Sequence, residues 1–306
     1  MDSLRGIETF IKAVETGSIA GAARSLGISS SAASQNIARL ESQVNAKLLT
    51  RTTRQLALTD SGSIYYEKVS SITRDLDLAG QAISNLNEQP QGKLCIASTV
   101  AFSRYVLAPL IPAFTQQYPR ISIELISTDR KVNHIKESVD ISIRIAEQLE
   151  DGLIAILLAS VPSKFCASPA YLTSAGCPTL PEELKEHSCL AFRYPVTGKF
   201  LPWGFTRNGK HFDAVIKPAV ISDDIGVLTQ LAIAGGGITR LVAFVANPYL
   251  ESGQLKELFT ANNKQKLKAE IDPLNFHLCV TDRYEKTPKV RAFVEFIKKA
   301  IPRQWR

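Results

Sequence analysis

Cysteine, histidine and methionine are scarce in this chain of 306 residues, which has five Cys, four His and one Met. No two cysteines form the Cys-x-x-Cys pair of many zinc and redox sites, and their number is odd. This usage argues against a disulfide framework and is typical of a protein from a reducing cytosol. The histidines lie far from one another, at positions 134, 187, 211 and 277, so neither a metal site nor a cofactor is expected.

Long hydrophobic runs are also missing, so a membrane-spanning helix is not expected. The nearest candidate, residues 228–246, contains three consecutive glycines and Arg240, which predicts a helix, a turn and a strand. The chain starts without the basic and apolar segments of a secretory signal, and a cytoplasmic location is therefore expected. It has no P-loop, nucleophile elbow or paired-carboxylate motif, which argues against an enzyme.

The charge balance favours an anionic partner. The chain has 36 Lys and Arg against 29 Asp and Glu, a formal net charge of +7. Nucleic acid fits this balance, although a basic soluble enzyme fits it equally well. The length predicts two or three domains.

Residues 18–41 have the pattern of a helix-turn-helix. An Ala-rich stretch ends at Gly27, and a second stretch is rich in Ser, Gln and Asn. Ser18 can cap the first of these helices, and Ser29 or Ser30 the second. The buried face of the second helix is expected to consist of Ala33, Ile37, Leu40 and Val44.

The opposite face of that second helix has short polar side chains and one methyl group. Such side chains can reach base edges and thymine methyls in the major groove of DNA. The alternative is a Ser-rich face that meets only solvent. The candidate DNA contacts of this helix are Ser29, Ser30, Ser31, Ser34, Gln35, Ala38 and Arg39.

Residues 46–59 predict a β-hairpin with cations at its tip. Two short apolar strands, 47–49 and 55–58, flank the segment Arg51-Thr52-Thr53-Arg54. Arg51 and Arg54 can neutralise phosphates, while Thr52 and Thr53 can hydrogen-bond to them. Residues 1–59 are therefore expected to form a winged helix-turn-helix domain that binds double-stranded DNA.

Residues 60–88 predict one long helix with a narrow apolar stripe. About 28 residues span roughly 42 Å, and a stripe of this length would be exposed on a monomer. We expect it to pair with a second chain, within a linker that extends to residue 89; the alternative is packing against the chain's own body. The stripe consists of Tyr65, Val69, Ile72, Leu76, Ala79, Ile83 and Leu86.

From residue 92 strands and helices alternate, which predicts a parallel sheet with helices on its faces. Strands are expected at 94–97, 121–126 and 140–145, with a helix between each pair. A second subdomain is expected from about Pro162, with a helix at 224–234 and a strand at 238–241.

A late strand at 275–280 and a final helix that opens at Thr287-Pro288 are expected to return to the first subdomain. Two crossings would then leave a cleft between two lobes. The predicted fold is α+β and multidomain. Residues 90–306 are expected to form its effector domain, with lobe I at 92–161 and 269–302 and lobe II at 162–268.

Polar side chains follow the first three expected strands at the sheet edge where ligands bind in α/β proteins. Hydroxyls, free amides and a guanidinium favour an anion, most simply a carboxylate. As alternatives, the hydroxyls can cap helices, and the guanidinium can pair with Glu124 or Glu147. With two residues of lobe II, the candidate effector-binding residues are Ser98, Thr99, Ser127, Thr128, Arg144, Arg193 and Ser222.

The chain resembles the LysR-type transcriptional regulator family over essentially its whole length, and most closely over residues 8–62. The Arg51–Arg54 segment resembles the wing of one large branch of that family. The residues in register with the family pattern are Phe10, Val14, Gly17, Ser18, Ala22, Ala23, Leu26, Ser34, Ile37, Leu40, Glu41, Leu58, Thr59 and Gly62.

The resemblance implies a winged helix-turn-helix, a dimerising linker helix and a two-lobed domain like a periplasmic binding protein. It also implies homotetramers that bend DNA and an effector in the cleft. DNA contacts are implied for Ser30, Ser31, Ser34 and Gln35, and effector contacts for Thr99, Thr128 and Arg144.

The chain departs from the family pattern at three places. Many relatives have Gln-Pro at Ser30-Ser31 and Arg at Gln35, so the operator preference of the family is not carried over. The Leu-Pro that follows the late glycines is here Leu241-Val242, preceded by Arg240.

Two other functions fit parts of the sequence. One is a solute-binding or enzymatic α/β protein with an accessory helical domain. The other is a redox sensor that uses Cys177 and Cys189.

Overall fold

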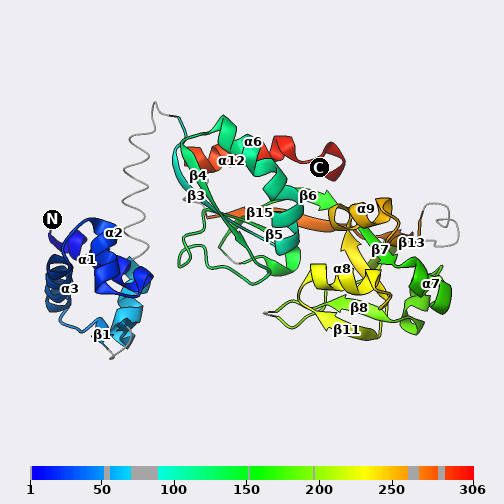
Figure 1. Ribbon diagram of the computed structural model, residues 1–306, viewed down its shortest axis with the longest axis horizontal. Coiled ribbons are helices and arrows are strands. Elements are labelled where there is room, and N and C mark those ends of the chain that lie inside the picture. The colour runs from blue at the N-terminus through cyan, green and yellow to red at the C-terminus, as the bar shows by residue number, and fades with distance from the viewer. Residues whose placement is uncertain are drawn as a thin grey trace. The chain divides into compact units, whose positions relative to one another are not determined.

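The computed structural model describes residues 2–51, 56–69, 89–150, 152–195, 197–260, 269–281 and 287–306. The chain forms two compact units, one of residues 1–88 with 135–137 and the other of residues 89–134 and 138–306. Figure 1 labels helices and strands of both units.

The first unit consists of a three-helix bundle, a two-stranded hairpin and a further helical segment at residues 60–69. The bundle contains α1 (Asp2–Thr16), α2 (Ile19–Leu26) and α3 (Ser30–Gln43), and the hairpin contains β1 (Leu49–Arg51) and β2 (Leu56–Leu58). Apolar side chains from all these parts share one core, whose buried members are Phe10, Ile11, Ala13, Ala22, Ile37, Leu40, Leu48 and Val69.

The predicted helix-turn-helix is confirmed. Ser18 caps α2 by accepting a hydrogen bond from the Gly21 amide at 3.0 Å. Gly27 follows α2 in the left-handed conformation, at φ 65°, and Ser29 caps α3. Within the predicted 60–88 helix, residues 60–69 are helical, and 70–88 lie outside the described residues.

The hairpin is antiparallel, as predicted, but its first strand begins at Leu49 and not at Lys47. The amide of Leu48 donates to a side chain of α3, and its own side chain is buried. Leu48 therefore belongs to the core of the unit and not to the hairpin ladder.

The first sheet of the second unit has the strand order β4-β3-β5-β15-β6. Its first three strands are parallel, but β15 is antiparallel to both β5 and β6, so the sheet is mixed and not parallel throughout as predicted. These strands are β3 (Gly92–Ser98), β4 (Ile121–Ser127), β5 (Ile141–Ile145), β6 (Ile154–Val161) and β15 (Leu274–Val280).

Two helices pack side by side on this sheet, joined by an aromatic contact between Phe114 and Phe293 at 5.3 Å (Figure 1). They are α6 (Ala108–Gln117), which continues α5 (Val100–Phe102) through a π-helical turn at Ser103–Leu107, and α12 (Pro288–Ala300). Short 3-10 segments lie at Ala146–Gln148 and Arg303–Trp305.

The helix predicted between the second and third strands is wrong. Residues 128–140 form bends and turns. Ser138 has a left-handed conformation, at φ 58°, which ends any right-handed helix there. Val132 and Val139 are instead buried against β3 by this turn structure.

The second lobe is built on a five-stranded sheet with the order β11-β8-β12-β7-β13 and a smaller sheet with the order β10-β9-β14. The first contains β7 (Ser163–Ala167), β8 (Cys189–Phe192), β11 (Pro218–Ser222), β12 (Ile238–Val242) and β13 (Lys256–Leu258). The second contains β9 (Gly204–Arg207), β10 (Lys210–Asp213) and β14 (Glu270–Ile271). The helices are α7 (Pro169–Ala175), α8 (Ile225–Ile233), α9 (Ala243–Glu251) and a 3-10 segment at Pro181–Glu186.

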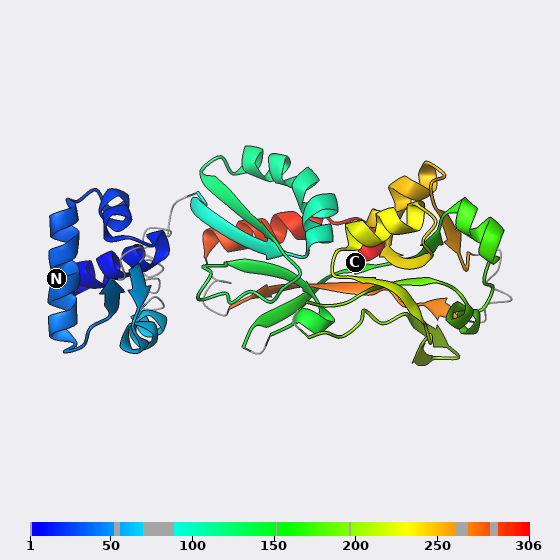
Figure 2. The same cartoon turned by 60° about the horizontal axis from the view of Figure 1, so that its bottom comes forward.

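The chain crosses between the lobes twice, as predicted. Pro162 separates β6 of the first sheet from β7 of the second, and residues 272–273 separate β14 from β15. The orange segment that holds β14 and β15 runs from one lobe to the other (Figure 2). Two neighbouring connections of this kind allow the lobes to move about a hinge.

We predict that Asp140→Ala lowers the free energy of unfolding of the second unit by about 3 kcal/mol. The buried Asp140 carboxylate accepts from the Cys95 amide at 2.9 Å and from Lys289 Nζ at 2.8 Å. Its loss leaves the Cys95 amide without this acceptor and Lys289 without its counter-charge, although Lys289 Nζ keeps its bond to the Lys93 carbonyl at 2.6 Å. Urea unfolding measures the change. Glu124→Ala, which removes an exposed partner of Lys93, is the control and costs less than about 1 kcal/mol. Equal losses would contradict the prediction.

Candidate DNA-binding face and interlobe cavity

The N-terminal half of α3 presents a polar face to solvent. Ser29 accepts from the Ala32 amide at 3.1 Å, and its hydroxyl lies 2.9 Å from that of Ser31. Ser34 is half-buried, while the other predicted contacts of the helix are exposed: Ser29, Ser30, Ser31, Gln35, Ala38 and Arg39. The structure thus brings the predicted set together on one side of α3, opposite the buried Ala33, Ile37 and Leu40.

A buried carboxylate connects α3 to the hairpin. Glu41 accepts from the amides of Leu48 and Leu49 at 2.9 and 3.2 Å and from Lys47 Nζ at 2.6 Å. Burial raises the pKa of Glu41, but the hydrogen bonds from Lys47 and from the two amides outweigh it and leave the pKa below its ordinary value of 4.5. Sequence reasoning matched Glu41 to a family motif and missed this role. A Glu at an otherwise apolar helix face, four residues after Ile37, was the available signal.

The same loop is held from its other side by Thr59. Its hydroxyl donates to the Lys47 carbonyl at 2.6 Å and accepts from the Gly62 amide at 2.8 Å. A side chain at Gly62 would collide with the Leu48 carbonyl oxygen. Residues 47–49 therefore join α3, the hairpin and the start of the 60–69 helix into one body.

The hairpin tip is described only in part. Arg51 ends β1, whereas Thr52 and Arg54 lie outside the described residues. The phosphate contacts expected of these three residues stay a prediction.

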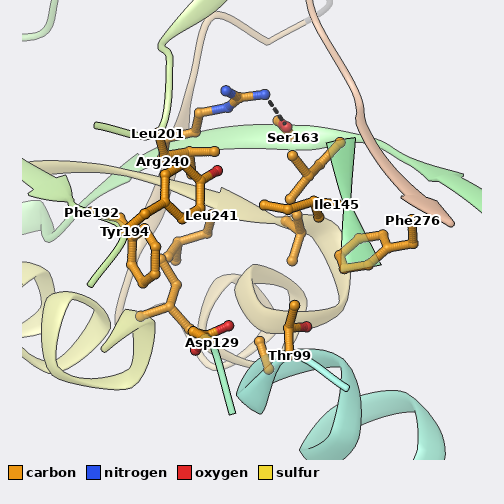
Figure 3. Close-up of a pocket in the computed structure, with 14 residues that line it drawn as sticks. Thr99, Asp129, Ile145, Ser163, Phe192, Tyr194, Leu201, Arg240, Leu241 and Phe276 are labelled. Atoms are coloured by element: carbon orange, nitrogen blue, oxygen red, sulfur yellow. Dashed lines mark hydrogen bonds between the residues drawn. The ribbon is translucent and has the colours of Figure 1, made fainter. Parts of the chain in front are cut away.

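A cavity of about 60 Å³ lies between the lobes of the second unit (Figure 3). Lobe I contributes Thr99, Asp129 and Ile145, and lobe II contributes residues from β7, β8, β12 and α8. The lining is mostly apolar, which is usual for small-molecule sites, although such sites commonly measure about 300–1,000 Å³. The remaining lining residues are Ala101, Ser163, Phe192, Tyr194, Leu201, Ile225, Arg240, Leu241, Val242, Leu274 and Phe276.

Among the predicted effector residues, only Thr99 lines this cavity. Its hydroxyl caps α5 by accepting from the Phe102 amide at 3.3 Å, which agrees with the capping alternative. The other six predicted residues lie outside the lining. Ser98, Thr128 and Arg144 are linked through backbone carbonyls, and the Arg193 amide donates to the Ser222 carbonyl at 2.9 Å. Ser127 is exposed at the end of β4.

Arg144 is buried and lies outside the cavity lining. Its Nη1 donates to the Thr128 carbonyl at 2.6 Å, and burial lowers the pKa of its guanidinium. Its Nη2 is buried with no hydrogen-bond partner within the described part of the chain. Glu124 pairs with Lys93 instead, so it is not the partner that the sequence offered as an alternative.

Sequence reasoning missed four polar lining residues: Asp129, Ser163, Tyr194 and Arg240. The departure from the family pattern at Arg240 was the one signal that pointed here. Its guanidinium is buried and donates to the Pro202 carbonyl, to Ser163 Oγ at 2.9 Å and to the Asp272 carbonyl at 2.9 Å. Asp129 and Tyr194 follow the ends of β4 and β8, and Ser163 begins β7, where a single sequence does not show which side chains face the cavity.

The structure does not favour the redox alternative. Cys189 is buried, its thiol lies 3.3 Å from the Leu184 carbonyl, and burial raises its pKa to about 12. A thiol of this kind forms little thiolate at neutral pH, so Cys189 is a poor partner for the exposed Cys177.

Neither a metal cluster nor a membrane span is found in the part of the chain that the structure describes. No three His, Cys, Asp or Glu side chains there are placed to hold a metal ion. No helix there is both long and apolar enough to cross a bilayer.

Two protein-family models match the chain. Residues 4–63 match the bacterial regulatory helix-turn-helix protein of the lysR family, and residues 87–302 match the LysR substrate binding domain. An uncharacterized HTH-type transcriptional regulator of Haemophilus influenzae is 31% identical over 271 residues, which cover 89% of this chain and 93% of that protein.

The HTH-type transcriptional regulator CrgA of Neisseria meningitidis serogroup B is 33% identical over 261 residues, or 85% of this chain and 86% of CrgA. A solved structure of CrgA, described as a LysR-type transcriptional regulator, has a TM-score of 0.59 at 30% identity. That match covers 96% of this chain and 97% of that chain.

We predict that Glu41→Ala lowers the free energy of unfolding of the first unit by about 2 kcal/mol, because the buried Leu48 amide and the partly buried Leu49 amide lose their acceptor. Since the folded-state pKa of Glu41 is lowered, this contribution is present above pH 4.5 and is lost as the pH falls through that folded-state pKa. Urea unfolding of the full chain and amide exchange at Leu48 and Leu49 measure the effect.

The control is Glu15→Ala, which removes an exposed ion pair with Lys12 in the same unit. Its cost stays below about 0.5 kcal/mol. Unchanged amide exchange in Glu41→Ala would overturn the prediction.

Proposed function

Because this chain belongs to the LysR family of bacterial helix-turn-helix regulators, we propose that it reads a pseudo-palindromic operator and changes its DNA-bound state when a small effector binds between its lobes. The chain is a DNA-binding transcriptional regulator with an effector-binding domain, and it is not an enzyme. The operator, the assembly and the effector are the proposed parts.

The exposed polar face of α3 is the observation that supports DNA reading most directly. We assign base contacts to Ser30, Ser31, Ser34 and Gln35, since these short side chains lie along the N-terminal half of the helix. The phosphate contacts are assigned to Ser29, Arg39, Arg51, Thr52 and Arg54.

Pairing of two chains supplies the second half-site. Residues 1–59 hold the DNA-binding domain, 60–89 the pairing helix and 90–306 the effector domain. Two such dimers form a tetramer. The apolar stripe of the 60–88 segment and the continuous helix at 60–69 support this arrangement.

We place the effector in the interlobe cavity, because both lobes line this cavity and two crossings join the lobes. A ligand that fits the closed cavity better than the open one favours closure, and closure shifts the assembly on DNA. The carboxylate expected from the sequence rests on the strand-end hydroxyls, on free amides at helix starts and on Arg144. Of the predicted effector residues only Thr99 lines the cavity, so the anionic class stays a prediction. A cytoplasmic location also stays a prediction.

We predict that Arg51→Ala weakens binding to every DNA sequence and lowers the slope of log K against log salt by about 1 per protomer. A gel shift on the promoter beside the protein's own gene, repeated over a salt series, measures both. Lys12→Ala is the control because it removes a cation of the same domain that pairs with Glu15. Binding with no salt dependence would count against the proposed function.

We predict that Gln35→Ala relaxes base preference at one position of each half-site, by about 1–3 kcal/mol of discrimination. Binding to a library of single-base operator variants measures the change, and the salt slope stays constant. An unchanged preference would remove Gln35 from the base-reading set.

A further inference from the structure

The cavity between the lobes holds one hydroxyl that the fold leaves without a partner. Tyr194 is 3% exposed and lines the cavity. Its hydroxyl is buried and has no hydrogen-bond partner among the described residues. A buried hydroxyl costs free energy unless it is paired, so a ligand atom that accepts from Tyr194 recovers this cost.

The guanidinium of Arg240, the basic group of the lining, already donates to three acceptors of the protein. These are the Pro202 carbonyl, Ser163 Oγ and the Asp272 carbonyl. In Figure 3 its guanidinium lies beside Ser163, on the side away from Asp129 and Thr99, so its aliphatic stem is nearer the cavity. A carboxylate that binds Arg240 through Nη2 would have to displace Ser163 or the Asp272 carbonyl.

An acid faces the cavity from the opposite side. Burial raises the pKa of the Asp129 carboxyl to about 6, and the charges of Asp224 and Asp223 also raise it. The hydrogen bond from the Val100 amide and the charge of Arg144 lower it. Asp129 is therefore mostly ionised at neutral pH and repels an anion. The positive charge of Arg144 offsets the negative charge of Asp129, which reduces the attraction of the cavity for a cation.

We infer that the cavity takes a small uncharged molecule with an apolar body and hydroxyl groups, which donate to the Asp129 carboxylate and accept from the Tyr194 hydroxyl. This inference rests on the proposed effector site and replaces the carboxylate that the sequence predicts. The volume of about 60 Å³ leaves room for roughly four to six non-hydrogen atoms. The rings of Phe192 and Phe276 line the cavity with apolar surface that suits the body of such a molecule.

Three probes with the same number of non-hydrogen atoms that differ at one end test the class: butane-1,4-diol, 3-hydroxypropionate and 4-aminobutan-1-ol. Each is titrated into the full chain at neutral pH up to ~50 mM, since so few atoms give weak binding at best. We expect the diol to bind about tenfold more tightly than the acid, which corresponds to about 1.4 kcal/mol, and more tightly than the amine. Tighter binding of the acid or the amine, or no binding of any probe, overturns the inference.

Two variants test the roles of Asp129 and Tyr194 in binding these probes. Asp129→Asn reduces the preference for the diol over the acid to about threefold or less, because the repelling charge is gone. Tyr194→Phe weakens binding of the diol severalfold, because the hydroxyl that donates to it is gone. The control is Glu186→Gln, which changes an exposed acid of lobe II outside the cavity lining and leaves all three affinities unchanged. A preference unaffected by Asp129→Asn also overturns the inference.

A gel shift without any probe separates this inference from the proposed function. If the chain fails to bind its operator but prefers the diol, the regulatory role fails and the ligand class stands. If it binds the operator but prefers the acid, only the ligand class fails.

Discussion

The hydrogen bonds between Glu41 and the loop after α3 fix the geometry of the DNA-reading unit. A recognition helix and a wing contact one DNA duplex together only when their separation matches the grooves. Here a carboxylate on α3 accepts two amides of the loop that leads into β1, and Thr59 holds the opposite side of that loop. Because Gly62 packs against the Leu48 carbonyl, the start of the next helix is fixed by the same contacts. The placement of α3, wing and pairing helix thus depends on one short segment of backbone.

Most of the DNA-binding unit could be predicted from sequence because its signals are local. Ser18, Gly27 and Ser29 mark helix ends through hydrogen bonds and backbone conformation within a few residues. Helical spacing identified Ala33, Ile37 and Leu40 as buried. Glu41 escaped because its partners lie beyond the end of its own helix, and periodicity says nothing about such contacts.

The second unit was predictable in outline and not in its site. The alternation of strands and helices predicted the two lobes and the return of β15 to the first sheet, but it did not reveal that β15 runs antiparallel to both of its neighbours, β5 and β6. Hydroxyls at strand ends suggested a ligand site, yet of these only Thr99 lines the cavity. Tyr194 and Arg240 come from loops and strands of the other lobe. Whether such residues face a cleft depends on how two sheets meet, which no local pattern encodes.

Arg240 links the two segments through which the lobes are joined. Ser163 directly follows the crossing at Pro162, and Asp272 lies in the other crossing, and the same Nη2 atom donates to both. Each of these bonds to a buried cation contributes about 1.5–3 kcal/mol. The two crossings are therefore fixed to each other where they enter lobe II. The chain departs from the family pattern at the residue that joins them.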